Sequence, residues 1–240
     1  MNARLDSLRK TFVGSRPWKC CLKRAILSPT FVTITNVADN GSGYFRITAA
    51  SHGFNTGDAI VVENITGMPT LCVANLVVTR IDANTLDVQT IAYAGTYSGG
   101  GRLAASALFD FNYKLAIPTD WVRTLLVNDD IHGYEWRNEG SYILTTSYPV
   151  NLIYIFDQTD YTAMPSTMYD ALGAFIAARL SYKLTQSTEL REMLNKESYS
   201  ASTRAAFYDS TQDPAKQVEA TEWQDSRIAG ILPFATDPMT

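Results

Sequence analysis

The clearest pattern of apolar and polar positions lies in residues 166–184, where apolar side chains recur every three or four residues. This spacing places them on one face of a helix, and Pro165 followed by hydroxyl residues is typical of a helix start. The residues on that face are Leu172, Phe175, Ile176, Leu180 and Leu184. We expect the first four, together with Trp18, to be core anchors.

Small side chains cover much of the remaining surface of this helix. A second helix is expected over about residues 188–210, and a third over residues 2–14. Helices with small residues at their contact can approach each other closely. We therefore expect the small positions to pack on the following helix or on a neighbouring subunit. These positions are Ala171, Ala174, Ala178, Ala201 and Ala205.

The pattern changes between residues 30 and 105, where Thr, Val, Ile and Tyr alternate with turns rich in Gly and Asn. Short strands at this spacing predict a small barrel or sandwich. The strands are expected at 34–37, 44–48, 59–62, 76–81 and 85–89. A glycine-rich segment at 97–102 is expected to be a flexible exit from this unit.

Alternation resumes after residue 106, which predicts further strands. They are expected at 108–117, 134–137, 142–146 and 151–156. Residues 118–126 favour a helical turn or the start of a strand, and residues 16–27 favour a short strand or an extended connection. The prediction is an α+β fold: a helical bundle with a small antiparallel sheet, interrupted by an inserted all-β barrel or sandwich. The expected units are a host domain at 1–29 and 106–228, the insert at 30–105 and a C-terminal tail at 229–240.

Composition and charge add further constraints. A hydrophobic share of 46% with 18% charged residues is typical of a soluble globular protein. Basic residues are concentrated in positions 1–29 and acidic residues after position 205, which suits contacts between neighbouring copies as well as two solvated helix faces. The odd count of 3 cysteines predicts free thiols in a reducing compartment. The sequence also lacks an apolar run long enough for a membrane span or a signal peptide.

Residues that could carry chemistry are sparse. His52 and His132 each lie beside a glycine in an expected turn, and are interpreted as polar turn residues. The adjacent pair Cys20 and Cys21 does not match a zinc spacing. Carboxylates at 129–130, 157 and 160 are interpreted as solvated turn residues. We therefore expect no enzymatic activity, no cofactor and no metal site.

Aromatic residues leave one alternative open. A sugar-stacking surface could form from Tyr93, Tyr97, Tyr134, Trp136, Tyr142 and Tyr148. Aromatic residues at alternate positions are more typical of packing between strands. A carbohydrate-binding or receptor-contact module carried by the insert is the alternative function.

Several short motifs follow one another in a fixed order along residues 1–30 and 108–228. Their positions are Pro17, Trp18, Lys23, Arg24, Ala25, Pro118, Asp120, Arg123, Glu139, Gly140, Ile143, Leu144, Thr145, Leu184, Thr185 and Ser187. This ordered set resembles the tail tubular protein A family of tailed bacteriophages, which are head-to-tail adaptors. Members usually have a further helix ahead of the one at residues 2–14, and the β insert is a second departure. The segment at 51–58 resembles a small β-barrel repeat found as an addition to phage structural proteins.

The resemblance implies a helical bundle with a small sheet that assembles into a ring, commonly of twelve copies, in the neck of the virion. Such a ring lies between the portal protein and the tail tube or nozzle protein, and DNA passes through it without sequence recognition. The protein would be made in the cytoplasm of the bacterial host, and no contact with a membrane is expected. We expect the apolar C-terminal tail to dock on the portal through Ile228, Ile231, Leu232 and Phe234.

Overall fold

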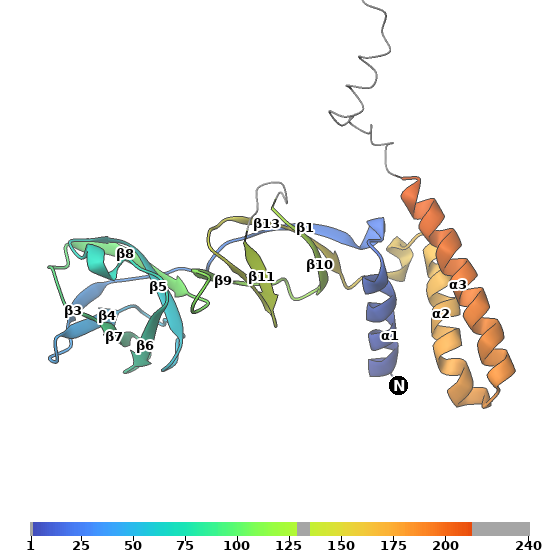
Figure 1. The fold of residues 1–240 in the computed structure, drawn as a ribbon, viewed down its shortest axis with the longest axis horizontal. Helices are drawn as coiled ribbons and strands as arrows, with labels where there is room; N and C mark the ends of the chain where they lie inside the picture. Colours follow the sequence, from blue (N-terminus) through green and yellow to red (C-terminus); the bar gives the residue numbers. More distant parts are fainter. Residues whose placement is uncertain (1, 129–134, 213–240) are drawn as a thin grey trace, which may run out of the picture.

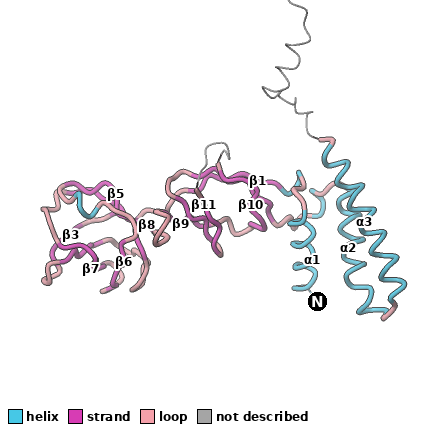
Figure 2. Tube along the Cα trace, in the orientation of Figure 1, coloured by secondary structure: helices cyan, strands magenta, loops and turns pink. Residues whose placement is uncertain are grey.

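The computed structural model describes residues 2–128 and 135–212. The chain is elongated, with three parts in a row (Figure 1). A curled sheet forms one end, two smaller sheets form the middle, and helices group at the other end (Figure 2).

The curled sheet is a half-barrel of seven antiparallel strands in the order β2-β8-β5-β6-β7-β4-β3. Its edge strands are separated only by Ile34 and Thr35, which donate backbone hydrogen bonds to Gly101 and Thr48, at 3.0 and 2.8 Å. One continuous segment therefore connects to strands at both edges. The strands are β2 (Val32–Thr33), β3 (Asn36–Asp39), β4 (Tyr44–Thr48), β5 (Ala59–Thr66), β6 (Leu76–Arg80), β7 (Thr85–Ala92) and β8 (Gly99–Ala105).

Strand β8 corrects the expectation of a flexible exit at 97–102, because it lies between β2 and β5 inside the sheet. Glycine serves close packing here. A Cβ atom added at Gly101 would lie 2.5 Å from the side chain of Ile65, and the φ of +96° also favours glycine. The half-barrel core is filled by large buried side chains such as Phe45, Ile47 and Leu86.

The middle of the molecule holds two three-stranded antiparallel sheets, which share a core that includes Leu115, Ile143 and Leu152. The first has the order β1-β13-β10 and the second the order β11-β12-β9. The strands are β1 (Leu22–Leu27), β9 (Tyr113–Ala116), β10 (Trp121–Val127), β11 (Trp136–Glu139), β12 (Tyr142–Thr145) and β13 (Val150–Phe156).

The helical end contains α1 (Asn2–Ser15), α2 (Ser166–Thr185) and α3 (Thr188–Ser210). Helices α2 and α3 are antiparallel and form what we call the helical hairpin (Figure 1). Gln186 ends α2 in a left-handed conformation with φ of 55°, and the Ser187 hydroxyl accepts a hydrogen bond from the Leu190 N–H at 3.2 Å to begin α3. No helix in the described part of the chain is long and apolar enough to span a membrane.

The predicted fold class, a helical bundle with a small sheet, is wrong. The described residues are mostly β, with three sheets and only three α-helices. The reason is the pairing of β1 and β10 with β13. Because of this pairing, the segments at 16–27 and 118–126, which the sequence left open between strand and other structures, contribute strands to a sheet at the centre of the molecule. Helix α1 contacts both α2 and β10 instead of adding to a bundle. All strands of the half-barrel come from residues 32–105, and the division into domains stays a prediction.

Candidate assembly surfaces

The candidate catalytic residues serve structural roles where the structure describes them. His52 is buried; its Nδ1 accepts a hydrogen bond from the Phe54 N–H at 3.0 Å, and its Nε2 lies 3.0 Å from the carbonyl oxygen of Asp82. These partners fix the tautomer with a proton on Nε2. His132 lies outside the described residues, as do the carboxylates at 129–130.

The cysteines are free, and the Sγ atoms of Cys20 and Cys21 lie 3.7 Å apart. The hydrogen bond with Cys20, together with burial, raises the pKa of the Cys21 thiol. Asp157 is engaged by Arg9 through two hydrogen bonds of 3.0 Å, and Asp160 accepts from a backbone N–H. Within residues 2–128 and 135–212, no three His, Cys, Asp or Glu side chains could jointly hold a metal ion.

The helical hairpin is joined through small side chains. Ala171, Ala178, Ala201 and Ala205 are buried, and Ala174 is half-buried beside the same core. Four of the five alanines are therefore buried within one chain, and their role in packing helices or subunits stays a prediction.

The expected core anchors are buried to different degrees. Trp18 is buried and stacks on Phe12, with ring centroids 5.4 Å apart, and Leu172 is also buried. Three further anchors, Phe175, Ile176 and Leu180, are only half-buried. The apolar face of α2 therefore turns gradually from the core toward solvent.

The helical hairpin exposes several large apolar and aromatic side chains. Exposure reaches 78% for Leu184 and 74% for Tyr199, values usual for charged surface residues. The exposed set is Tyr169, Tyr182, Leu184, Met193, Tyr199, Phe207 and Tyr208. The helical hairpin therefore buries some large apolar side chains, such as Met168 and Leu172, and exposes others that a soluble monomer usually covers.

A groove of about 550 Å³ lies between α2 and α3. It is lined by small residues such as Gly173 and Ala177 and by the charged residues Asp170, Glu197 and Arg204. Apolar and charged side chains also occur together at protein contact surfaces.

Motif residues distant in sequence meet at the first middle sheet. Lys23 forms an ion pair with Asp120, and the Tyr154 hydroxyl donates to the same carboxylate at 3.0 Å. Burial raises the pKa of Asp120, but the hydrogen bonds from Lys23 and Tyr154 outweigh this effect and hold it below its usual range. Burial and the bond to Asp120 raise the pKa of Tyr154 to about 12. The Arg123 guanidinium donates to the Gly14 carbonyl at 2.9 Å, so these motif residues tie β1, β10 and β13 together and connect the sheet to α1.

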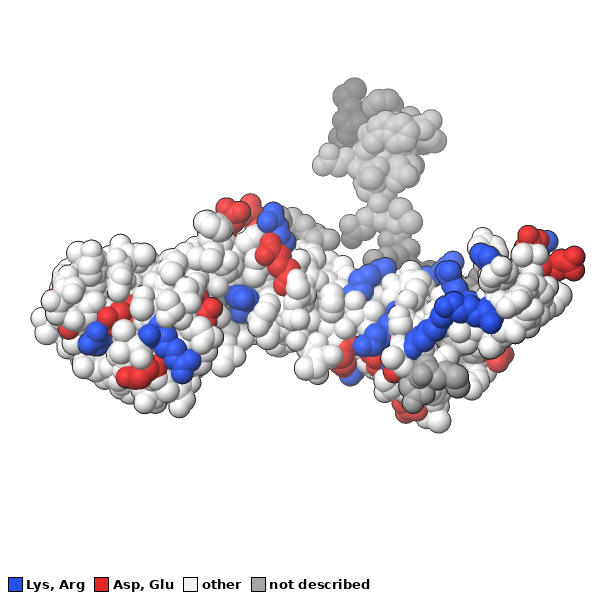
Figure 3. All heavy atoms as spheres, turned by 90° about the horizontal axis from the view of Figure 1, so that it is seen from below, with Lys and Arg blue, Asp and Glu red and all other residues white. Residues whose placement is uncertain are grey.

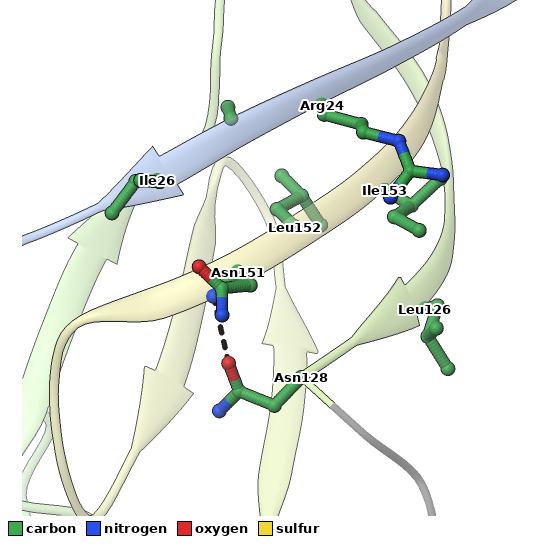
Figure 4. Close-up of a pocket in the computed structure, with 8 residues that line it drawn as sticks. Arg24, Ile26, Leu126, Asn128, Asn151, Leu152 and Ile153 are labelled. Atoms are coloured by element: carbon green, nitrogen blue, oxygen red, sulfur yellow. Dashed lines mark hydrogen bonds between the residues drawn. The ribbon is translucent and has the colours of Figure 1, made fainter.

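The outer face of the β1-β13-β10 sheet is covered only at one end. There Leu22 and Ile155, which are register partners, pack against the helical core. At the other end the face is open and forms a depression of about 510 Å³, which we call the sheet groove. The residues that line it include Arg24, Ile26, Leu126, Asn128, Asn151 and Ile153 (Figure 4). Ile26 is 73% exposed, so this apolar face is not covered by residues 2–128 and 135–212.

A cluster of polar and aromatic residues joins the half-barrel to the middle sheets. Glu63 on β5 accepts hydrogen bonds from Arg102 at 2.9 Å and from the hydroxyls of Tyr113 and Tyr148. Arg102 also lies over the Phe31 ring, 3.9 Å from its centroid. Burial raises the pKa of Glu63, but these hydrogen bonds outweigh it and lower the pKa overall.

The aromatic residues considered for sugar binding are dispersed. Tyr93 packs on Phe45 in the half-barrel, and the Tyr97 hydroxyl donates to backbone carbonyls of the same unit. Trp136 packs on the core of the middle sheets, while the Lys114 ammonium lies over the Tyr142 ring. Tyr148 belongs to the cluster around Glu63. Tyr134 lies outside the described residues.

A scan against protein-family models and a search of curated proteins found no match to the chain. The tail residues expected to dock on the portal, Ile228, Ile231, Leu232 and Phe234, lie outside the described residues. The sheet groove was missed by sequence reasoning. The signal that could have found it is Ile26, an apolar residue that alternates with inward-facing Ala25 and Leu27 in β1.

Proposed function

We propose that this chain is a structural, non-enzymatic subunit of the neck of a tailed bacteriophage, where copies assemble into a ring between the portal and the tail tube or nozzle. The observation that carries the proposal is the number of large apolar side chains that the helical hairpin exposes. Soluble monomers rarely expose large apolar patches, and such patches usually mark contacts with other proteins. A second copy of the chain is the occupant that we propose for this surface.

The resemblance to the tail tubular protein A family supports the location in the neck and a ring of twelve copies. The ion pair of Lys23 with Asp120 and the bond from Arg123 to Gly14 give these motif residues a physical reason to occur together. The helical bundle that the resemblance implies is contradicted by the mostly β architecture, so the fold class does not support the proposal. The support from the motif residues lies in these contacts.

Passage of DNA through the ring is the third part of the proposal. Lys and Arg side chains gather on the face of the helical end that Figure 3 shows. Contacts between such side chains and phosphates are independent of base sequence and weaken with salt. A channel that lets DNA pass needs contacts of this kind.

Imaging of the purified chain with portal particles by negative stain, together with mass photometry of the chain alone, tests the proposal. We expect rings of twelve copies attached to the portal. A chain that stays monomeric at all concentrations, with and without portal, would contradict the proposed function.

Docking of the tail is tested separately. Replacing Ile231, Leu232 and Phe234 together with Ser should abolish attachment to portal particles, since these residues supply the apolar surface of the tail. Deletion of residues 237–240 is the matched control and should leave attachment unchanged. Normal attachment of the triple variant would contradict docking through the tail and would leave the proposed ring unaffected.

A further inference from the structure

Phe109 is the most exposed large apolar side chain of the described residues, at 85%. It lies in the loop between β8 and β9, next to Leu108 and Asp110. Both Leu108 and Phe109 have positive φ values, 63° and 60°, which bulky residues rarely adopt. An unusual backbone conformation therefore presents an aromatic ring to solvent.

The loop is held in this conformation by the half-barrel. The side-chain amide of Asn75 donates to the carbonyl of Phe109 at 2.8 Å, and the Ser106 hydroxyl donates to the side-chain oxygen of Asn75. A loop whose backbone is already held loses less conformational entropy on binding than a mobile one. Residues Leu108–Asp110, which we call the knob, are thus prepared for a contact.

The sheet groove has the chemistry that matches the knob. Its apolar surface, with Ile26, Leu126 and Ile153, suits an aromatic ring. Arg24 lies beside Ile153, its register partner, and its guanidinium has no ion pair with any described residue. Asp110 is exposed, and it too has no ion-pair partner in residues 2–128 and 135–212. A cation beside an apolar groove complements a carboxylate beside an aromatic ring.

We propose that the knob of one copy docks into the sheet groove of the next copy, with Phe109 on the apolar floor and Asp110 paired with Arg24. The knob and the groove are different surfaces of one chain, so their contact is heterologous. Contacts of this type generate a closed ring when the rotations between successive copies add up to one full turn. This inference rests on the proposed function and names a contact between neighbours in the ring, in addition to the helical hairpin.

Single variants on each side test the contact by mass photometry of the full chain over a range of concentrations. Phe109→Ala and Ile26→Glu should each weaken the affinity between neighbouring copies by about 30-fold, the loss typical of a central interface residue. The matched control is Ile81→Glu on the half-barrel, which is 51% exposed and should leave assembly unchanged.

Mixing the two variants tests whether the contact is heterologous. Each mixed pair would have one intact knob and one intact groove, so we expect the mixture to form dimers that neither variant forms alone. Charge reversal gives a second test: Arg24→Asp and Asp110→Arg should each weaken assembly, and the double variant should recover most of it.

The outcomes separate the two proposals. If the wild-type chain forms rings and Phe109→Ala, Ile26→Glu and the charge reversals form the same rings, the knob contact is overturned while the proposed function stands. If the wild-type chain stays a monomer even with portal, the proposed function fails and this contact fails with it.

Discussion

The half-barrel and the helical hairpin bury their apolar residues in opposite ways. In the half-barrel, large side chains such as Phe45, Ile47 and Leu86 have no exposed surface. In the helical hairpin, many of the buried positions are small, such as Ala171 and Ala205, and several large side chains, such as Tyr199 and Phe207, are exposed. Because the hydrophobic contribution scales with apolar area removed from water, each internal contact in the helical hairpin contributes less than one in the half-barrel. We infer that the half-barrel is stable through its own core, and that the helical hairpin gains part of its stability from neighbouring molecules.

The largest expected effect on folding comes from the half-barrel core. Phe45→Ala removes a fully buried ring and should lower the free energy of unfolding by about 3–5 kcal/mol, measured by chemical denaturation. The adjacent Tyr44 is 37% exposed, so Tyr44→Ala is the matched control and should cost less than about 1 kcal/mol. Equal effects of the two substitutions would contradict a self-sufficient core.

Overpacking of the helical hairpin should have a smaller effect. Ala205 is 2% exposed, and Ala205→Leu adds three carbon atoms to this buried side chain. The substitution should destabilise the helices by about 1–3 kcal/mol, measured by circular dichroism at 222 nm. Ser200→Leu, an exposed position on α3, serves as the control. If both variants melt at the wild-type temperature, α2 and α3 are packed more loosely than the structure shows.

The cluster around Glu63 links the two regions through the middle sheets and gives stability a pH dependence. The lowered pKa of Glu63 means that its contribution is present above the unfolded-state value of about 4.3, and is lost as pH falls through the folded-state value. Glu63→Gln should cost about 1–2 kcal/mol at pH 7 and reduce the loss of stability below pH 4, measured by thermal melts.

Glu139→Gln is the matched control, since Glu139 forms only an exposed pair with Arg137 and should change stability little. A Glu63→Gln melt with the same acid dependence as the wild-type chain would show that this cluster contributes no pH-linked stability.

Elements with local signals could be predicted from the sequence. The expected helices at 166–184 and about 188–210 match α2 and α3 closely, because helical periodicity is a local signal and Pro165 marks the start of the first. Pairing between distant segments could not be predicted, since Lys23 and Asp120 are far apart in the chain and their contact depends on the whole sheet. Strand β8 was not predicted, because three consecutive glycines at 99–101 are typical of a flexible segment when only the neighbouring residues are considered.

The candidate surfaces show the same limit. Helical periodicity identifies which residues share a face, but what covers that face depends on tertiary packing. Leu172 and Leu184 belong to one predicted stripe, yet the first is buried by the helical core and the second is 78% exposed. The knob depends on a backbone conformation that Leu108 and Phe109 do not signal in sequence.

The smallest expected effect on folding, and the largest on assembly, comes from the outer face of α3. Tyr199→Ser combined with Phe207→Ser changes two residues that are 74% and 64% exposed, so the free energy of unfolding should shift by no more than about 0.5 kcal/mol per site. We propose that the exposed large apolar side chains of the helical hairpin contact a second copy. Mass photometry of the wild-type chain should then show rings, and the double variant should give folded monomers. Rings of unchanged size from the variant would contradict this contact.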